Sequence, residues 1–356
     1  MNDDNPSKLP RILAVGGPTA IGKTSMGIAL AKHVNGEVIS ADSVQLFRGF
    51  RIGAATPSPE EQQGVKHHLI ACLAPTETIT AADFARRADA AIHDILARGK
   101  TPIIVGGSGL YLRALLYGLI DAPARDDALR ARLETLANTH GDEALWEHLH
   151  QKDPESAQAL HPNDRVRIIR ALEVLELTGK SIQQTQQEHR FQQPKYHVAG
   201  IGLTAQRHEI HRRINLRTQQ MFDQGLIREV QELLANGVPT TAQPFTAIGY
   251  KEVLAFLENA PDAKNAEAIA QLQQDIATHT RRFARRQLVW FRKEPSFRWV
   301  NIDSLDECLH QLLAATQHFL RGDRWTFALE SEREASDTML KPKHKKTTSS
   351  KEPKPM

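Results

Sequence analysis

The sequence predicts an α/β fold in which helices flank a parallel β-sheet, with an all-helical insertion and a helical C-terminal region. In residues 1–120, short apolar strands alternate with helical patterns, which is the order of a parallel sheet with helical crossovers. Strand signals are missing from 121–193, and one further strand then opens the otherwise helical segment 194–330. The last segment, 331–356, is rich in Lys, Ser, Thr and Pro, and we expect it to be disordered.

The first predicted strand, Ile12–Val15, leads into a loop bounded by glycines and then into a helix. The loop has the spacing GxxxxGK[ST], in which successive backbone N–H groups surround an anion at a helix N-terminus. Lys23 adds a positive charge, and the Thr24 hydroxyl is placed to hold Mg²⁺. The predicted ligand is a chain of phosphates, either transferred or used as a leaving group. The loop residues are Gly17, Pro18, Thr19, Ala20, Ile21, Gly22, Lys23 and Thr24.

The second predicted strand, Glu37–Ser40, is followed almost directly by Asp42. Ligands of open parallel sheets bind beyond the carboxyl ends of the strands, so we expect this carboxylate to face the phosphate site. It could act there as a general base or coordinate Mg²⁺. The alternative is a purely local role as the N-cap of the next helix.

The third predicted strand, Thr101–Val105, follows a helix at 82–98 whose apolar residues recur at helical spacing. Two glycines and Ser108 come after this strand, where a helicase or transport ATPase usually has an acidic residue. This disfavours a motor that hydrolyses ATP. The phosphate loop, Asp42 and Ser108 each follow a strand, and we therefore expect them to converge.

The insertion shows helical patterns at 128–137, 143–150 and 165–177 and no strand signal. A fourth strand, Tyr196–Leu203, then returns the chain to the sheet. Residues 205–320 are mostly helical in pattern.

Positive charge is concentrated rather than spread over the chain. The net charge is +3, but the segment 341–356 alone carries +5, which leaves −2 for the remainder. The second cluster is Thr280–Lys293, which holds six basic residues and no acidic one. Arginines four residues apart stack along one helix face, so a phosphate backbone is the expected partner. A solvated helix face is the alternative.

Several classes of protein are disfavoured by what the sequence lacks. No apolar run approaches the roughly 20 residues of a membrane span, and the N-terminus has no secretory pattern. Cys72 and Cys308 are too few for a disulfide framework or a cysteine zinc site. His67 and His68 show no metal-ligand pattern and are interpreted as packing residues. We expect a cytoplasmic protein without a membrane partner.

Taken in order, these segments resemble the tRNA dimethylallyltransferases, the IPP transferase family, from about Arg11 to Leu320. The phosphate loop alone is shared by many kinases, whereas the ordered set of motifs is specific to this family. The low cysteine count favours the bacterial type, because the eukaryotic branch carries a C-terminal zinc finger. Besides the loop, the matching segments are 39–45, 67–70, 81–84, 105–111, 167–174, 248–252 and the Arg-rich helix.

The resemblance implies a P-loop NTPase-like core and a defined reaction. A dimethylallyl group would pass from dimethylallyl diphosphate to N6 of an adenosine next to the anticodon of tRNA, with release of diphosphate. The loop would hold the diphosphate with Mg²⁺ at Thr24, and Asp42 would be the general base. Ser108, where relatives often have Thr, would hydrogen-bond near the reacting groups.

The resemblance also implies contacts with the anticodon stem-loop of tRNA and extrusion of the target adenine into a pocket. The insertion would close over the open side, and we expect a monomer. Departures from the family pattern occur at Ile21, Ala71 and Val166. The expected tRNA-binding residues are Asp42, Ser43, Val44, Gln45, Ser108, Arg130, Val166, Arg167, Ile168, Ile169, Arg170, Ala247, Ile248, Gly249, Tyr250, Lys251, Glu252, Thr280, Arg281, Arg282, Phe283, Ala284, Arg285, Arg286 and Gln287.

Three alternatives stay open from the residues alone. A small-molecule or nucleotide kinase could use 121–193 as a lid, but it leaves the Arg281–Arg286 cluster without a purpose. An adenylate isopentenyltransferase would prenylate free adenine nucleotides. An RNA-binding protein could use the loop only to sense a nucleotide.

Overall fold

The structure, a computed structural model, describes residues 9–119, 123, 125–189, 194–259 and 265–327. The chain divides into two compact units. The sheet unit comprises residues 1–80, 87–111 and 196–356, and the helical unit comprises 81–86 and 112–195. The predicted disorder of 331–356 lies outside the described residues, as do parts of both ends of the predicted insertion.

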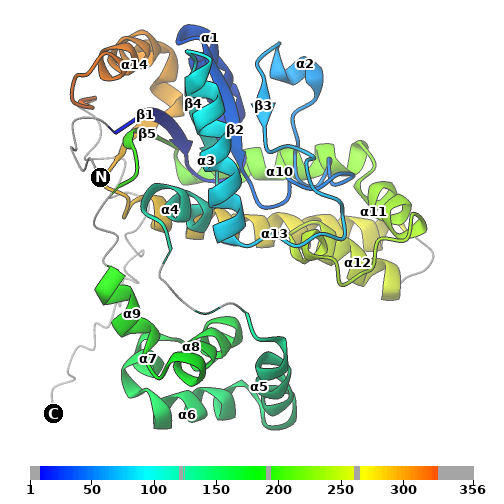
Figure 1. Ribbon diagram of the computed structural model, residues 1–356. Helices are drawn as coiled ribbons and strands as arrows, with labels where there is room; N and C mark the ends of the chain where they lie inside the picture. Colours follow the sequence, from blue (N-terminus) through cyan, green and yellow to red (C-terminus); the bar gives the residue numbers. More distant parts are fainter. Residues whose placement is uncertain (1–8, 120–122, 124, 190–193, 260–264, 328–356) are drawn as a thin grey trace, which may run out of the picture. The chain divides into compact units, whose positions relative to one another are not determined.

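A parallel six-stranded sheet forms the centre of the sheet unit, with strand order β3-β2-β4-β1-β5-β6 (Figure 1). The central strands are continuous apolar runs that are buried almost throughout, as expected for a sheet covered on both faces. The α/β class with a parallel sheet is therefore confirmed. The strands are β1 (Arg11–Gly16), β2 (Gly36–Ala41), β3 (His67–His68), β4 (Thr101–Gly106), β5 (His197–Thr204) and β6 (Phe297–Asn301).

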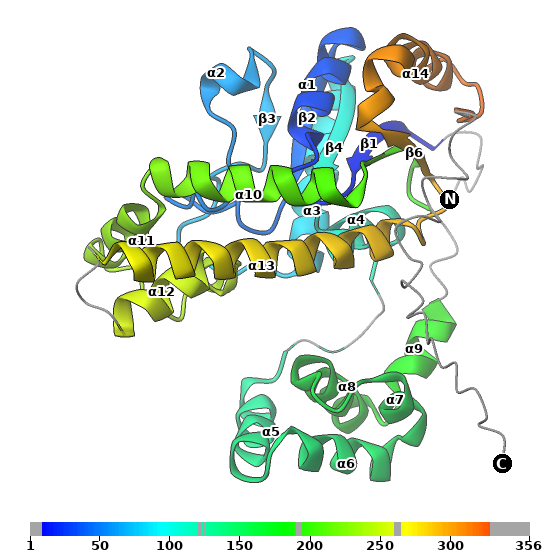
Figure 2. The same ribbon diagram turned by 180° about the vertical axis from the view of Figure 1, so that it is seen from behind.

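Helices of the sheet unit pack on this sheet and on one another. Helix α1 contacts β1, β2 and β4, and α14 contacts β1. Figure 2 shows α10 and α13 lying side by side, and the two helices are in contact. The bounds are α1 (Lys23–His33), α2 (Pro59–Gln62), α3 (Ala81–Ala97), α4 (Gly109–Tyr117), α10 (Arg207–Asp223), α11 (Leu226–Ala235), η2 (Gln243–Thr246), α12 (Tyr250–Asn259), α13 (Ala266–Phe291), η3 (Ile302–Ser304) and α14 (Leu305–Leu320). Residues 81–86 of α3 and 112–117 of α4 belong to the helical unit.

The helical unit is built on its own apolar core, and no strand occurs among its described residues. Leu145, Leu149, Ile168 and Leu172 are completely buried at its centre. Its helices are α5 (Asp127–His140), α6 (Asp142–Lys152), α7 (Pro154–Ala159), α8 (Arg165–Thr178) and α9 (Ile182–His189).

A buried carboxylate, Glu173 of α8, is hydrogen-bonded to several other residues of this unit. It accepts hydrogen bonds from Arg130 Nε and Nη2 at 2.8 and 2.9 Å, from the Asp126 amide at 2.9 Å, and from Arg170. Burial by itself raises the pKa of Glu173, but these donors outweigh it and lower the pKa to about 2. Glu173 therefore stays ionised inside the unit.

Replacing Glu173 with Ala should destabilise the helical unit by about 3–5 kcal/mol, because two arginines lose their buried partner. The folded pKa lies below the ordinary value of 4.5, so this stabilisation is complete above pH 4.5 and is lost as the pH falls toward 2. Urea unfolding at pH 7 and at acid pH measures the difference in unfolding free energy between the wild type and Glu173→Ala. This difference should be smaller in acid. Exposed Glu147→Ala is the control, and equal effects of both substitutions would contradict the assignment.

Candidate active site

The loop that follows β1 forms a backbone cradle at the N-terminus of α1. Three residues have positive φ, namely Gly17 (136°), Ala20 (65°) and Gly22 (98°), where Gly22 is the N-cap of the helix. A Cβ at Gly17 would lie 2.6 Å from the Leu203 carbonyl oxygen, so this position needs glycine. The predicted residues Gly17–Thr24 thus adopt a strand–loop–helix arrangement whose N–H groups can bind an anion.

Lys23 lies beneath this cradle. Its Nζ donates to the carbonyls of Gly17 (3.2 Å) and Pro18 (2.7 Å). Burial, together with the nearby guanidinium of Arg217, lowers the pKa of Lys23 to about 7, while Asp42 opposes the shift. Too little negative charge lies near the ammonium to stabilise its protonated form, and a bound phosphate would provide that charge.

Asp42 begins the loop after β2, as predicted. Its Oδ1 accepts hydrogen bonds from the backbone N–H groups of Val44 (2.8 Å) and Gln45 (3.2 Å). No described residue makes a hydrogen bond to Oδ2, so one oxygen fixes the carboxylate and the other is left for a ligand. The residues after Asp42 form a turn and the next helix, α2, begins only at Pro59, so Asp42 fixes a turn instead of capping a helix, and its second oxygen is not used.

The loop after β4 is held close to both of these segments by α13. Gln287 of α13 accepts from the Thr19 amide at 2.8 Å and donates to the Gly107 carbonyl at 3.1 Å. A Cβ at Gly107 would lie 2.2 Å from Gln287 Nε2, which explains a glycine there. The Ser108 amide donates to the Ala41 carbonyl at 3.3 Å, which places this loop beside the one that carries Asp42.

Two adjoining cavities surround these groups. The cradle cavity, of about 280 Å³, is lined by the phosphate loop, Asp42 and residues of α10. The acceptor cavity, of about 390 Å³, is lined by Asp42, Ser108 and residues of α10, η2, α12 and α13. Thr19, Asp42 and Arg217 belong to both linings, so the carboxylate stands where the two cavities meet. The predicted convergence of the three loops is thereby confirmed.

Three residues of these linings have functional positions that the sequence did not reveal. Arg217 of α10 donates to the Thr19 hydroxyl at 2.6 Å and lines both cavities, and burial lowers its pKa. Arg213 lines the cradle cavity one turn earlier. His67, interpreted as a packing residue, also lines it, and its buried Nε2 has no hydrogen-bond partner among the described residues.

His68 differs from its neighbour. Its Nε2 contacts Glu37 Oε2 at 2.7 Å, in a buried ion-pair cluster with Arg98 and Lys100. Hydrogen bonding to Arg98 and to the other donors lowers the pKa of Glu37 well below its ordinary range, against the effect of burial. The packing interpretation therefore suits His68 alone.

Most of the predicted tRNA-binding residues of the sheet unit line the acceptor cavity. Ser43, Lys251 and Arg286 are exposed members of this lining, and the guanidinium of Arg286 lies over the Phe283 ring at 5.7 Å. In addition to Asp42 and Ser108, the lining members are Ser43, Val44, Ala247, Ile248, Lys251, Thr280, Phe283, Arg286 and Gln287.

Several members of the predicted set, including the cavity-lining Gln287, are buried or hydrogen-bonded within the protein, and their contact with tRNA stays a prediction. Tyr250 and Ala284 are buried, and Gln287 is 6% exposed with its amide already bonded to two loops. Gln45 donates to the Ala54 and Ala55 carbonyls. Glu252 caps the Gly249 amide at 2.7 Å and pairs with His279.

In the helical unit, the predicted tRNA-binding residues likewise include both buried or paired side chains and exposed ones. Ile168 and Ile169 belong to its apolar core. Arg130 and Arg170 pair with Glu173. Of the predicted residues there, Val166 and Arg167 are exposed, and Val166 is 73% exposed.

The arginines of α13 form an exposed basic row beside the acceptor cavity. Arg282, Arg285 and Arg286 are exposed, and no carboxylate of the described residues pairs with them. Arg281 instead donates to Asn215 of α10 at 2.7 Å. The unpaired members of the row remain available to a polyanion.

Comparisons with known proteins agree with this geometry. The family model described as IPP transferase matches residues 45–294. The chain is 45% identical over 314 residues to tRNA dimethylallyltransferase 2 of Syntrophus aciditrophicus, which covers 88% of this chain and 98% of the relative. It is 44% identical over 299 residues to tRNA dimethylallyltransferase of Geobacter sulfurreducens, with coverage of 83% and 94%.

Two solved structures are similar as well. The tRNA isopentenylpyrophosphate transferase of Bacillus halodurans aligns with a TM-score of 0.62 and 38% identity, covering 88% of this chain and 98% of its own. A eukaryotic dimethylallyltransferase acting on tRNA aligns with a TM-score of 0.74 and 25% identity, covering 90% and 81%. Among the described helices, none is long and apolar enough to cross a membrane.

Proposed function

The chain belongs to the IPP transferase family, and from this premise we propose that it transfers a dimethylallyl group from dimethylallyl diphosphate to N6 of an adenosine beside the anticodon of tRNA. Its homologues are tRNA dimethylallyltransferases, and the chain is an enzyme of this activity. The observation that carries the finer proposal is the position of Asp42, at the junction of a phosphate cradle and a second cavity beside a basic helix.

The donor diphosphate would occupy the cradle. One cavity is lined by the phosphate loop, whose backbone N–H groups can donate to an anion, and by Lys23 and Arg217, which add positive charge. As the bond from C1 to the diphosphate oxygen breaks, negative charge grows on the leaving group, and these donors stabilise it. The positive charge left on the allylic group makes it reactive toward a weak nucleophile.

The acceptor adenine would occupy the second cavity, extruded from its stack in the anticodon loop. The N6 lone pair is delocalised into the ring, so the amine attacks only a strongly activated electrophile. Asp42, with Oδ1 fixed by two amides, would accept the N6 proton on Oδ2 as the new C–N bond forms. Ser108 lines the same cavity and would hydrogen-bond near the reacting groups.

Mg²⁺ is the proposed cofactor, and the residues present fit it. The hydroxyl of Thr24 supplies an oxygen atom to the cradle cavity, and magnesium prefers a few protein oxygens together with phosphate. Among the described residues, no group of three or more His, Cys, Asp or Glu could hold a metal ion. Bound there, Mg²⁺ would neutralise charge on the departing diphosphate.

Incubation of the purified protein with dimethylallyl diphosphate, Mg²⁺ and unmodified tRNA tests the proposal. Nucleoside mass spectrometry should find one dimethylallyl group on adenosine. A parallel reaction with AMP as acceptor should give no product. Product from AMP alone would favour prenylation of free nucleotides, and ATP consumption without prenylation would favour a kinase.

Neutralising Arg282 and Arg286 together should weaken tRNA binding and reduce its salt dependence. Each phosphate that the protein no longer neutralises lowers the slope of log affinity against log salt by about 1, so the double alanine variant should bind with a slope about 2 smaller. Filter binding over a range of salt concentrations measures the slope, with exposed Arg228→Ala as the matched control. An equal loss of dimethylallyl diphosphate binding would show instead that the variant is misfolded.

A further inference from the structure

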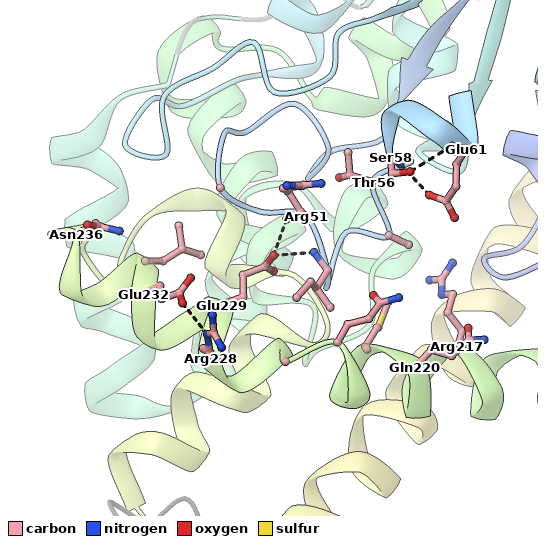
Figure 3. Close-up of a pocket in the computed structure, with 17 residues that line it drawn as sticks. Arg51, Thr56, Ser58, Glu61, Arg217, Gln220, Arg228, Glu229, Glu232 and Asn236 are labelled. Atoms are coloured by element: carbon pink, nitrogen blue, oxygen red, sulfur yellow. Dashed lines mark hydrogen bonds and ion pairs between the residues drawn. The ribbon is translucent and has the colours of Figure 1, made fainter. Parts of the chain in front are cut away.

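A short turn, Arg51–Ala55, has its backbone bound by two side chains from distant helices. Glu229 of α11 accepts hydrogen bonds from three consecutive amides, those of Arg51 (3.1 Å), Ile52 (2.8 Å) and Gly53 (3.4 Å). The next amide, Ala54, donates to the Tyr250 hydroxyl at 3.2 Å. Figure 3 shows Glu229 reaching from α11 to this backbone.

Glu229 and Tyr250 also bind each other. The Tyr250 hydroxyl donates to Glu229 Oε1 at 2.7 Å, and the ring is fully buried against Phe50 at 4.9 Å between centroids. A Cβ at Gly53 would lie 2.6 Å from that ring, so the turn sits as close to Tyr250 as glycine permits. We call Glu229 and Tyr250 the clamp.

The other side of the turn is joined to the predicted base. Gln45 donates from Nε2 to the carbonyls of Ala54 and Ala55, both at 3.2 Å. The backbone N–H of Gln45 donates to Asp42 Oδ1. Displacement of the turn would therefore also disturb the segment that fixes Asp42.

The turn lies between three cavities. Arg51, Ile52 and Ala55 line an open polar cavity of about 920 Å³ against α10 and α11 (Figure 3). Ala54 and Ala55 also line the cradle cavity, while Gly53 and Ala54 line the acceptor cavity. The backbone of the turn thus separates the open 920 Å³ cavity from the cradle and acceptor cavities, where the two substrates would react.

We propose that Glu229 and Tyr250 are positioning residues that hold the Arg51–Ala55 turn closed against water during prenyl transfer. This inference rests on the proposed function. Once the C1–O bond breaks and diphosphate leaves with the electron pair, the allylic carbon can bond to adenine N6 or to a water oxygen. The first path gives prenylated tRNA and a proton, and the second gives dimethylallyl alcohol and a proton. The clamp favours the first path by excluding the competing water.

The test is the ratio of diphosphate released to prenylated tRNA formed, measured at saturating tRNA. The variants are Tyr250→Phe, which keeps the ring and loses both hydrogen bonds of the hydroxyl, and Glu229→Gln, which replaces one acceptor oxygen by a donor. Both should raise the ratio from about 1 to several-fold higher and lower kcat for transfer by roughly 10-fold or more. Glu232→Gln is the control, because this residue lies on the same helix and cavity but binds Arg228 instead of the turn.

The ratio separates positioning from a general loss of stability. A variant that is merely less stable has fewer active molecules, and each of these still releases one diphosphate per prenyl group. A ratio near 1 in Tyr250→Phe and Glu229→Gln, at any level of activity, would overturn the inference. Failure of the wild-type protein to prenylate tRNA would instead refute the proposed function, which is a separate result.

Discussion

Replacing Asp42 with Asn is expected to lower kcat for prenyl transfer by about 10²–10⁴-fold, the usual contribution of a positioned general base. The amide oxygen of Asn can still accept from the Val44 and Gln45 amides, so the loop should keep its conformation. The substitution removes the basic oxygen that takes the N6 proton. Binding of donor and tRNA should stay close to that of the wild type, since the contacts of the cradle and of α13 are unchanged.

Steady-state kinetics with labelled donor measure this effect, with binding followed separately by titration. Exposed Asp223→Asn on α10 is the control for the loss of a carboxylate elsewhere. If Asp42→Asn retains most of its turnover, Asp42 is only the cap of its loop. The RNA-binding alternative, in which the phosphate loop senses a nucleotide, predicts that RNA binding is unaffected and that no prenyl transfer occurs in any variant.

Replacing Lys23 with Met should lower kcat/KM for dimethylallyl diphosphate by about 10²–10³-fold, because a donor to the developing charge of the leaving group is removed. The ammonium lies beneath the cradle and contacts the Gly17 and Pro18 carbonyls, so no other lysine can take its place there. Binding of tRNA should be unchanged. If binding of dimethylallyl diphosphate and binding of tRNA were both lost, the substitution would have disrupted the loop.

The same lysine predicts a pH dependence of donor binding. In the free protein its pKa is lowered to about 7, chiefly by burial and then by Arg217. Bound phosphate stabilises the ammonium, so above pH 7 binding must take up a proton, and affinity should fall by up to about tenfold per pH unit. Calorimetry with diphosphate in buffers of different ionisation enthalpy measures the net proton uptake, which Lys23→Met should lower by up to one proton per diphosphate bound.

Much of the sheet was predictable because its central strands are short apolar runs buried on both sides, of which Ile12–Val15 is an example. Two edge strands escaped prediction for different reasons. β3 is a pair of histidines with no apolar signal. β6 reads Phe-Arg-Trp-Val-Asn, and its aromatic and branched residues were a usable signal that an otherwise helical region obscured.

The cradle and Asp42 were predictable because their roles follow from local spacing and from the ends of strands. Arg217 was not, since α10 carries several arginines and nothing in the sequence distinguishes the one that packing brings to Thr19. Gln287 was predicted to bind tRNA, and the sequence did not reveal that its carboxamide also joins two loops that lie 180 and 268 residues away in the chain. Such roles depend on tertiary contacts.

Side-chain burial within the motifs was the other feature that motif matching did not reveal. A motif match includes every residue of a segment, but a helix exposes only one face. In α8 the apolar pair Ile168 and Ile169 faces the core, while Arg167 is exposed. Tyr250 begins α12 and is buried by its neighbours Phe50 and Phe245. Helical periodicity would have separated these positions before the structure was known.

In the proposed reaction, the cradle holds the part of the donor that is released, rather than a phosphate that is transferred. Dimethylallyl diphosphate labelled with carbon in the prenyl group and with phosphorus in the diphosphate tests it directly, in the presence of Mg²⁺ and unmodified tRNA. We predict that the carbon label enters tRNA while an equal amount of phosphorus label appears as free diphosphate. Phosphorus label on the acceptor, or transfer of the terminal phosphate of ATP without any carbon label in tRNA, would contradict the account.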